Sequence, residues 1–156
     1  MSTNYYFENK SSIKRWELQN QRVDSYFDEL RLNLIKMGFD EDKVNDKLED
    51  IKWEFNTPIE RLHIGKRSAG WKPLFEIQEQ YSSVNEMKEW YFNNKEDWLI
   101  VDEYDRELTW DELEEKLINW NGTKSHIQFM KENYPSSYLN DYKEIDGYEW
   151  CRGEFS

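Results

Sequence analysis

The clearest pattern in the chain is a pair of apolar stripes with helical spacing. From Trp16 onward, apolar residues recur every three or four positions, which is the period of one helix face. This first stripe consists of Val23, Tyr26, Phe27, Leu30, Leu34 and Met37. Gly38 can end the helix, and Asp40 can cap the next one. The second stripe consists of Val44, Leu48, Ile51 and Phe55, before Asn56-Thr57-Pro58. The pattern predicts a helical hairpin over residues 16–56.

The segments on either side of this hairpin have the character of strands. The first ten residues, which include Tyr5-Tyr6-Phe7, are expected to form a short strand or an extended arm. Ile59, Leu62 and Ile64 mark a second strand, and a glycine-containing loop, Gly65–Gly70, is expected to follow it. Trp71–Ile77 is expected to be another strand, in which Pro73 indicates an edge or a bulge.

Helix and strand signals alternate in the rest of the chain. Ser83 with Glu86, and Thr109 with Glu112, have the spacing of capping boxes that begin helices. Trp98–Val101 is a buried strand candidate, Asn121-Gly122 is expected to end the second helix, and the tail 134–156 is expected to hold one or two short strands. The order of elements predicts an α+β fold, a small antiparallel sheet with packed helices and an inserted helical hairpin, within a single domain of residues 1–156.

The composition indicates a folded chain whose core is built largely from rings. Only 37% of the 156 residues are hydrophobic, but 17% are aromatic. Each buried ring removes about 150–250 Å² from water, which compensates for the scarcity of aliphatic residues. Disordered chains of comparable charge usually lack aromatic residues.

The net charge of −12 limits the classes of partner. It opposes nonspecific binding to nucleic acid and to anionic membranes, because phosphate groups repel it, and it suits a partner with a basic surface. One interpretation is a solvated surface that keeps the protein soluble. The other is that the acids imitate a phosphate backbone and occupy a nucleic-acid groove on another protein.

A basic segment, Arg61–Lys72, stands out in this acidic chain. Glycines permit close backbone approach, and successive N–H groups of such a loop can surround an anion while cationic and hydroxyl side chains add contacts. The candidate anion-binding residues are His63, Gly65, Lys66, Arg67, Ser68, Gly70 and Trp71. The spacing does not match a Walker A motif. The alternative is a hairpin loop whose basic side chains neutralise neighbouring acids.

An acidic run between positions 102 and 115 is the second candidate site. Its acids are Asp102, Glu103, Asp105, Glu107, Asp111, Glu112, Glu114 and Glu115. They are expected to form either a solvated face or a patch that contacts a partner protein. A calcium-loop pattern is absent from the run, and acids in a first helical turn are ordinary because they favour the helix dipole.

Catalytic and metal-binding signals are weak. The two histidines, His63 and His126, lie far apart in sequence, and the lone Cys151 can form neither an internal disulfide nor a cysteine zinc cluster. We therefore expect no metal, no cofactor and no enzymatic activity. The beginning of the chain has no apolar signal core, and no stretch is long enough to cross a bilayer, so the expected location is the reducing cytoplasm.

Four short blocks of the chain resemble those of a family of small phage proteins. The matching blocks are Thr3-Asn4-Tyr5-Tyr6, His63–Trp71, Asp102–Glu107 and Gly147–Trp150 followed by Glu154-Phe155-Ser156. The resemblance implies a phage origin and an α+β core, and no established activity. Members of that family usually carry a Cys-x-x-Cys pair where this chain has Asn9–Ser12, so no metal site is carried over, and Asp105 stands where they have a turn glycine.

These observations favour a phage accessory protein that binds and inhibits a host defence protein. The expected partner has a basic surface, as nucleases and other nucleic-acid-binding proteins do, and the expected location is the host cytoplasm. The acidic run and the exposed face of the 16–56 hairpin are the expected contact surfaces. The alternative function is a nucleotide- or phosphate-binding module that uses residues 63–71, for example to sequester a signalling nucleotide, with Tyr5, Tyr6 or Trp71 stacked on the base.

Overall fold

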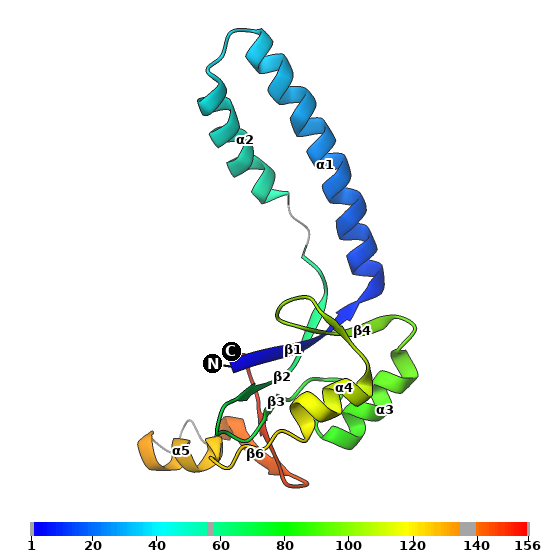
Figure 1. Ribbon diagram of the computed structural model, residues 1–156, viewed down its shortest axis with the longest axis vertical. Coiled ribbons are helices and arrows are strands. Elements are labelled where there is room, and N and C mark those ends of the chain that lie inside the picture. The colour runs from blue at the N-terminus through cyan, green and yellow to red at the C-terminus, as the bar shows by residue number, and fades with distance from the viewer. Residues whose placement is uncertain (1, 56–57, 135–139, 156) are drawn as a thin grey trace. The chain divides into compact units, whose positions relative to one another are not determined.

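The chain divides into two compact units in the computed structural model, which describes residues 2–55, 58–134 and 140–155 (Figure 1). The first unit comprises Met1–Asn9 and Arg61–Ser156, and the second is Lys10–Glu60. Helices and a mostly antiparallel sheet confirm the predicted α+β class. Whether the two units act as the expected single domain stays a prediction.

The first unit is built on a seven-stranded sheet in the order β5-β4-β1-β2-β3-β7-β6. The strands are β1 (Ser2–Asn9), β2 (Arg61–Ser68), β3 (Leu74–Glu76), β4 (Trp98–Asp102), β5 (Glu107–Leu108), β6 (Tyr142–Ile145) and β7 (Tyr148–Cys151). The pair β3–β7 is parallel, and the other pairs are antiparallel. Strands β1 and β2 are therefore central although the 51 residues of the second unit separate them in sequence.

Helices pack against one face of this sheet and enclose an aromatic core. They are α3 (Val84–Asn94), α4 (Trp110–Leu113) and the π-helical turn η1 (Glu114–Ile118), while α5 (His126–Asn133) follows later in the chain. Phe75 stacks on Trp150 with ring centroids 5.1 Å apart, and Phe7 stacks on Tyr91 at 5.5 Å. Rings supply about half of the buried core cluster, and aliphatic side chains such as Leu113 and Leu117 supply much of the rest, so the core is less dominated by rings than expected.

The prediction of a loop over Gly65–Gly70 is wrong, because the first four of these residues lie in β2. Gly65 pairs with Tyr5 of β1 and with Phe75 of β3, next to a bulge in the β1–β2 register. A Cβ atom on Gly65 would lie 2.4 Å from the carbonyl oxygen of Leu74, so close strand pairing explains this glycine better than a loop does. The expected strand Trp71–Ile77 is likewise shortened to Leu74–Glu76.

Helix starts agree closely with the capping signals. Thr109 and Glu112 form a complete capping box at the start of α4. Ser83 caps α3 by accepting the backbone N–H of Glu86, but the Glu86 carboxylate binds Ser82, so this second box is only half formed. The helix expected to run to Asn121 changes to π-helical geometry at Glu114 and ends at Ile118.

The second unit is a helical hairpin of α1 (Lys10–Lys36) and α2 (Glu41–Glu54). Helix α1 begins six residues before the expected Trp16, directly after β1. It ends at Lys36, and Gly38 follows as the expected stop, with a φ of 92° that allows the Phe39 N–H to reach the Leu34 carbonyl. Asp40 caps α2 through the Lys43 N–H. Asn56 and Thr57, expected to end the hairpin, lie outside the described residues. In the described part of the chain, no helix combines the length and apolarity needed to cross a membrane.

Candidate functional site

The residues of the basic segment do not come together at one anion site. Because β2 is a strand, its side chains alternate between the two sheet faces, and its backbone N–H groups lie within the sheet and not in an open loop. The Arg67 guanidinium lies over the Trp120 ring at 4.5 Å and donates to the Lys116 carbonyl. The proposed backbone cradle at residues 65–68 is therefore wrong, although anion binding by the side chains stays a prediction.

Three other members of the segment line a shared cavity of about 310 Å³. These are Lys66, Ser68 and Trp71, with His126 and Phe129 of α5 opposite them. The Trp71 ring stacks on the His126 ring at 4.8 Å. Gly70 lies in the turn before this cavity, where its carbonyl accepts two backbone N–H groups from the 123–124 segment. This cavity shares no lining residue with the one that His63 lines, although Lys66 also lies over the ring of Phe155 at 5.5 Å.

Asp102, the first acid of the acidic run, is not available to a partner. It is only 3% exposed and accepts the backbone N–H groups of Tyr104 and Arg106 as well as the Arg106 guanidinium. Burial alone would raise the pKa of Asp102, but these hydrogen bonds outweigh burial and lower it below its usual range. The prediction that Asp102 contacts a partner is wrong, because it organises the 102–106 turn.

Most of the remaining acids in this run also have intramolecular contacts. Glu103 accepts from Asn4, Asp105 binds Arg61, Glu112 completes the α4 cap and Glu114 accepts from the Trp110 indole. Asp105 has a φ of 61°, which agrees with the turn-glycine position noted in the sequence. The exposed carboxylates of this run with room for a partner are Glu107, Asp111 and Glu115.

The strongest candidate site is a polar cavity of about 500 Å³ on the sheet, which we call the sheet-face pocket. Strands β1, β2 and β3 and the segment after β7 supply its lining. The lining residues are Tyr6, Arg61, His63, Glu76, Ile77, Gln78, Gly153, Glu154 and Phe155. The bulge in the β1–β2 register, at Tyr5/Tyr6, lies beside it. Bulges often re-aim side chains next to functional sites.

A network of hydrogen-bonding side chains forms the floor of the pocket. His63 Nε2 lies 3.0 Å from Asn4 Oδ1, while Asn4 Nδ2 donates to Glu103. With Asn4 in this orientation, Nε2 carries the imidazole proton, and the His63 ring also has a hydrogen bond with the Gly65 backbone. His63 Nδ1 lies 3.6 Å from Glu76 Oε2, which also accepts from Gln78 Nε2 at 2.7 Å.

Burial keeps both ionisable groups of this network close to neutral. The side chains of His63 and Glu76 are 12% and 8% exposed. Burial raises the pKa of Glu76 to about 7, with partial opposition from the Gln78 hydrogen bond. Burial lowers the pKa of His63 to about 4. Their separation would suit an ion pair, but poor solvation opposes both charges, so we infer a neutral imidazole beside a carboxyl group that is roughly half protonated near neutral pH.

Aromatic rings border the two buried groups. The Tyr6 ring lies 5.2 Å from the His63 ring, and the Phe155 ring meets His63 edge-on at 4.7 Å. The Arg61 guanidinium lies over Tyr6 at 4.8 Å and is held by Glu8 and Asp105. The pocket therefore offers buried hydrogen-bond donors and acceptors between ring surfaces, with the charged side chains of Arg61 and Glu154 also in its lining.

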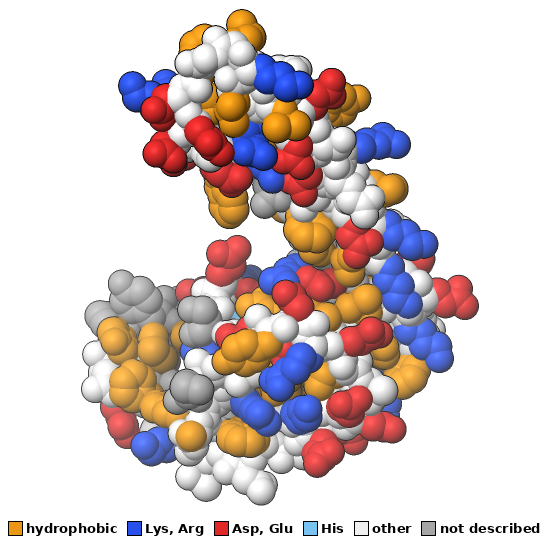
Figure 2. Space-filling view, turned by 45° about the horizontal axis from the view of Figure 1, so that its top comes forward, with side chains coloured by type: hydrophobic (Ala, Val, Ile, Leu, Met, Phe, Trp, Pro, Cys, Tyr) orange, Lys and Arg blue, Asp and Glu red, His pale blue; other side chains and the backbone are white. Residues whose placement is uncertain are grey.

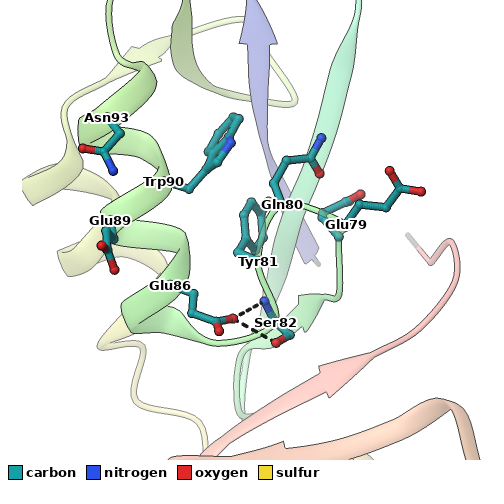
Figure 3. Close-up of a pocket in the computed structure, with 9 residues that line it drawn as sticks. Glu79, Gln80, Tyr81, Ser82, Glu86, Glu89, Trp90 and Asn93 are labelled. Atoms are coloured by element: carbon teal, nitrogen blue, oxygen red, sulfur yellow. Dashed lines mark hydrogen bonds between the residues drawn. The ribbon is translucent and has the colours of Figure 1, made fainter.

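A second open cavity, of about 470 Å³, lies between α3 and the segment before it (Figure 3). Figure 3 shows the Trp90 and Tyr81 rings side by side, with Glu86 turned toward Ser82. Both hydrogen bonds drawn there, from the Ser82 N–H and hydroxyl to Glu86, belong to the start of α3. These bonds explain Ser82 and Glu86 locally, whereas the buried Tyr81 hydroxyl, which also lines this cavity, has no hydrogen-bond partner among the described residues.

Sequence reasoning found His63 but missed its partners. Glu76 carried a usable signal, because it is a carboxylate between Phe75 and Ile77 in a short apolar strand. Asn4 and Phe155 carried none, since only the sheet order brings the two ends of the chain beside β2. Among the residues that the structure describes, no cluster of three or more His, Cys, Asp or Glu side chains is arranged to hold a metal ion.

Comparison with known proteins returned no matching family model, no matching curated protein and no matching solved structure, so function is argued from the geometry of the pocket.

Proposed function

We propose that the protein is a binding module whose sheet-face pocket takes a small, flat, polar ring compound of the chemical class of nucleobases and nucleosides. The observation that carries this proposal is the buried His63 side chain, which lies between the rings of Tyr6 and Phe155 and 3.6 Å from the buried Glu76 carboxyl group. Perturbed ionisable groups in a cavity are typical of functional sites. The pocket volume of about 500 Å³ also suits a ligand of this size.

The chemistry of the pocket matches that of a heteroaromatic ring. A half-protonated carboxyl group can both donate and accept a hydrogen bond, and the Gln78 amide and His63 imidazole add further groups of both kinds. Stacking of a base on an aromatic side chain contributes about 1–3 kcal/mol. Burying such groups without partners costs free energy, so a ligand that satisfies them gains specificity as well as affinity.

The charge distribution favours the uncharged part of a nucleotide over its phosphate. Arg61 is the cation among the lining residues, and Glu8 and Asp105 already bind it. A phosphate would have to compete with those carboxylates in a chain of net charge −12. We therefore expect a nucleoside to bind at least as tightly as the corresponding nucleotide.

Titration calorimetry with free bases, nucleosides and nucleotides tests this proposal. Glu76→Ala and Tyr6→Ala should each weaken binding of the best ligand at least tenfold. His126→Ala is the matched control, because His126 is a second half-buried histidine that lines the other cavity, and it should leave affinity unchanged. Absence of heat with every compound, or an equal loss in the control, would end the proposal.

A second candidate function is binding to a protein with a basic surface, such as a nucleic-acid-binding defence protein of a phage host. The exposed carboxylates Glu107, Asp111 and Glu115 favour it. A pull-down from host lysate should recover such a partner mainly at low salt, since exposed charge contacts are screened. The variant with Glu107→Gln, Asp111→Asn and Glu115→Gln should lose the partner, and retention by this variant would exclude the mechanism.

A further inference from the structure

The helical hairpin of α1 and α2 exposes large apolar side chains along one side. Tyr26 is 73% exposed, Leu30 44%, Ile51 45% and Phe55 59%. Tyr26 and Leu30 are four residues apart, so they lie on one side of α1, and Ile51 of α2 has the same spacing to Phe55, the residue that caps the end of α2. The Phe55 ring lies 6.3 Å from the ring of Phe27, which is three residues before Leu30 and therefore on the same side of α1, and this contact joins the two sets. We call these four residues the hairpin stripe.

The hairpin does not bury this stripe within itself. Val44 and Leu48 are the hydrophobic side chains of α2 that are buried, and the described part of α1 has no buried hydrophobic residue. Two helices alone provide little enclosed volume, whereas four helices enclose a continuous apolar core. In Figure 2, hydrophobic side chains alternate with charged ones over the hairpin surface, the upper part of the view.

We propose that the hairpin stripe is a self-association surface that pairs with the same stripe of a second copy of this chain. The pairing is isologous, so that two hairpins related by a two-fold axis complete a four-helix arrangement. This inference does not depend on the sheet-face pocket, which lies in the other unit.

The exposed area of the stripe is sufficient for such a dimer. Four large side chains of roughly 200 Å² each, about half exposed, offer roughly 450 Å² per copy. Two copies with their flanking polar atoms therefore bury about 1,000 Å² or more, which is the lower limit for a specific protein–protein interface. A modest interface of this kind predicts a dimer that dissociates on dilution.

The charge distribution identifies a second copy as a suitable occupant. Residues 10–60 carry nine basic and twelve acidic side chains, a net charge of −3, whereas the rest of the chain has a net charge of −9. Identical surfaces repel when they carry net charge of one sign, so the hairpin is where two copies approach at least cost. A strongly basic partner would find its complement outside the hairpin.

Sedimentation velocity of the full chain over a range of concentrations tests this proposal. Leu30→Glu places a charge within the stripe, and Leu32→Glu places the same charge on an equally exposed residue of the same helix that points away from it. Wild type and Leu32→Glu should reach twice the chain mass of 19.3 kDa at high concentration, with Leu30→Glu dissociating at least tenfold more readily.

Circular dichroism establishes that both variants keep the wild-type helix content. A wild-type protein that stays monomeric at every concentration would overturn the proposal, including the case in which the stripe binds a different protein. Equal weakening by Leu30→Glu and Leu32→Glu would overturn it as well, because the contact would then not be at the stripe.

Discussion

Replacement of Glu76 by glutamine should change how the stability of the protein depends on pH. The folded protein holds the Glu76 proton more tightly than the unfolded chain, because burial raises the pKa from an ordinary 4.5 to about 7. The stability that this carboxyl group contributes is fully present below about pH 4.5, and it is lost as the pH rises through about 7. The glutamine side chain keeps the shape of the glutamate without a titrating proton.

The expected magnitude follows from the size of the pKa change. One pKa unit corresponds to about 1.4 kcal/mol, so the full change would penalise the ionised form by about 3 kcal/mol. The unfolded carboxyl group already titrates near pH 4.5, so part of this penalty is present at pH 5, and about 2 kcal/mol of it develops between pH 5 and pH 8. The difference in unfolding free energy, variant minus wild type, should therefore rise by about 2 kcal/mol between pH 5 and pH 8.

Unfolding measurements on the wild-type protein alone would not reveal the contribution of Glu76 to the pH dependence of stability. The pKa of His63 is lowered from 6.5 to about 4, so its contribution is present above pH 6.5 and is lost as the pH falls through about 4. Between about pH 4.5 and 6.5 the two contributions change in opposite directions and nearly cancel. A comparison of variants is needed to separate them.

Urea unfolding monitored by tryptophan fluorescence at pH 5 and pH 8 provides the measurement. Glu89→Gln on α3 is the control, because Glu89 is exposed, and its difference from wild type should stay within about 0.5 kcal/mol at both values. A Glu76→Gln difference that stays the same at pH 5 and pH 8 would refute the reasoning, since it would mean that folding does not raise the pKa of Glu76.

Three further substitutions test the fold around the site. Gly122→Ala should destabilise the protein by about 3 kcal/mol or more in urea unfolding, because its Cβ would lie 1.5 Å from the Trp71 carbonyl oxygen; a loss below about 1 kcal/mol would contradict that packing. Asp102→Asn should cost about 2–3 kcal/mol at pH 7, because it replaces the Oδ2 atom that accepts from the Arg106 guanidinium with an NH₂ donor and removes the charge that strengthens the two backbone hydrogen bonds to Oδ1. Since the pKa of Asp102 is lowered by folding, this loss should shrink as the pH falls through the folded-state pKa, and a pH-independent loss would argue against it. Thr109→Ala should cost about 1 kcal/mol through the α4 cap, whereas exposed Thr123→Ala should cost almost nothing, and equal losses would exclude the capping explanation.

Local signals in the sequence predicted the elements whose geometry is itself local. Caps at Asp40 and Thr109 and the left-handed residue Gly38 depend on neighbours within a few positions, so they were predictable. The role of Gly65 was predicted wrongly because it is not set by its neighbours in sequence. Its local context suggests a loop, whereas its actual constraint is the Leu74 carbonyl of an adjacent strand.

The sheet-face pocket was beyond prediction because it is assembled from distant segments. Asn4, His63, Glu76 and Phe155 come from β1, β2, β3 and the tail, and the sheet order is what brings them together. Successive side chains of a strand also point to opposite faces of the sheet, which is why the side chains of the basic segment are divided between the two sheet faces. A charged residue inside a short apolar strand, as at Glu76, is the signal that sequence reasoning could have used.

The protonation state of Glu76 is the property on which the proposed pocket chemistry most depends. A carbon-13 NMR titration of the side-chain carboxyl group in the free protein measures it directly, with the exposed glutamates as internal references. The account predicts a midpoint near pH 7, well above the ordinary glutamate range. A midpoint at or below that range would contradict it, because the pocket would then hold a permanent carboxylate and select a cationic ligand instead of a neutral ring.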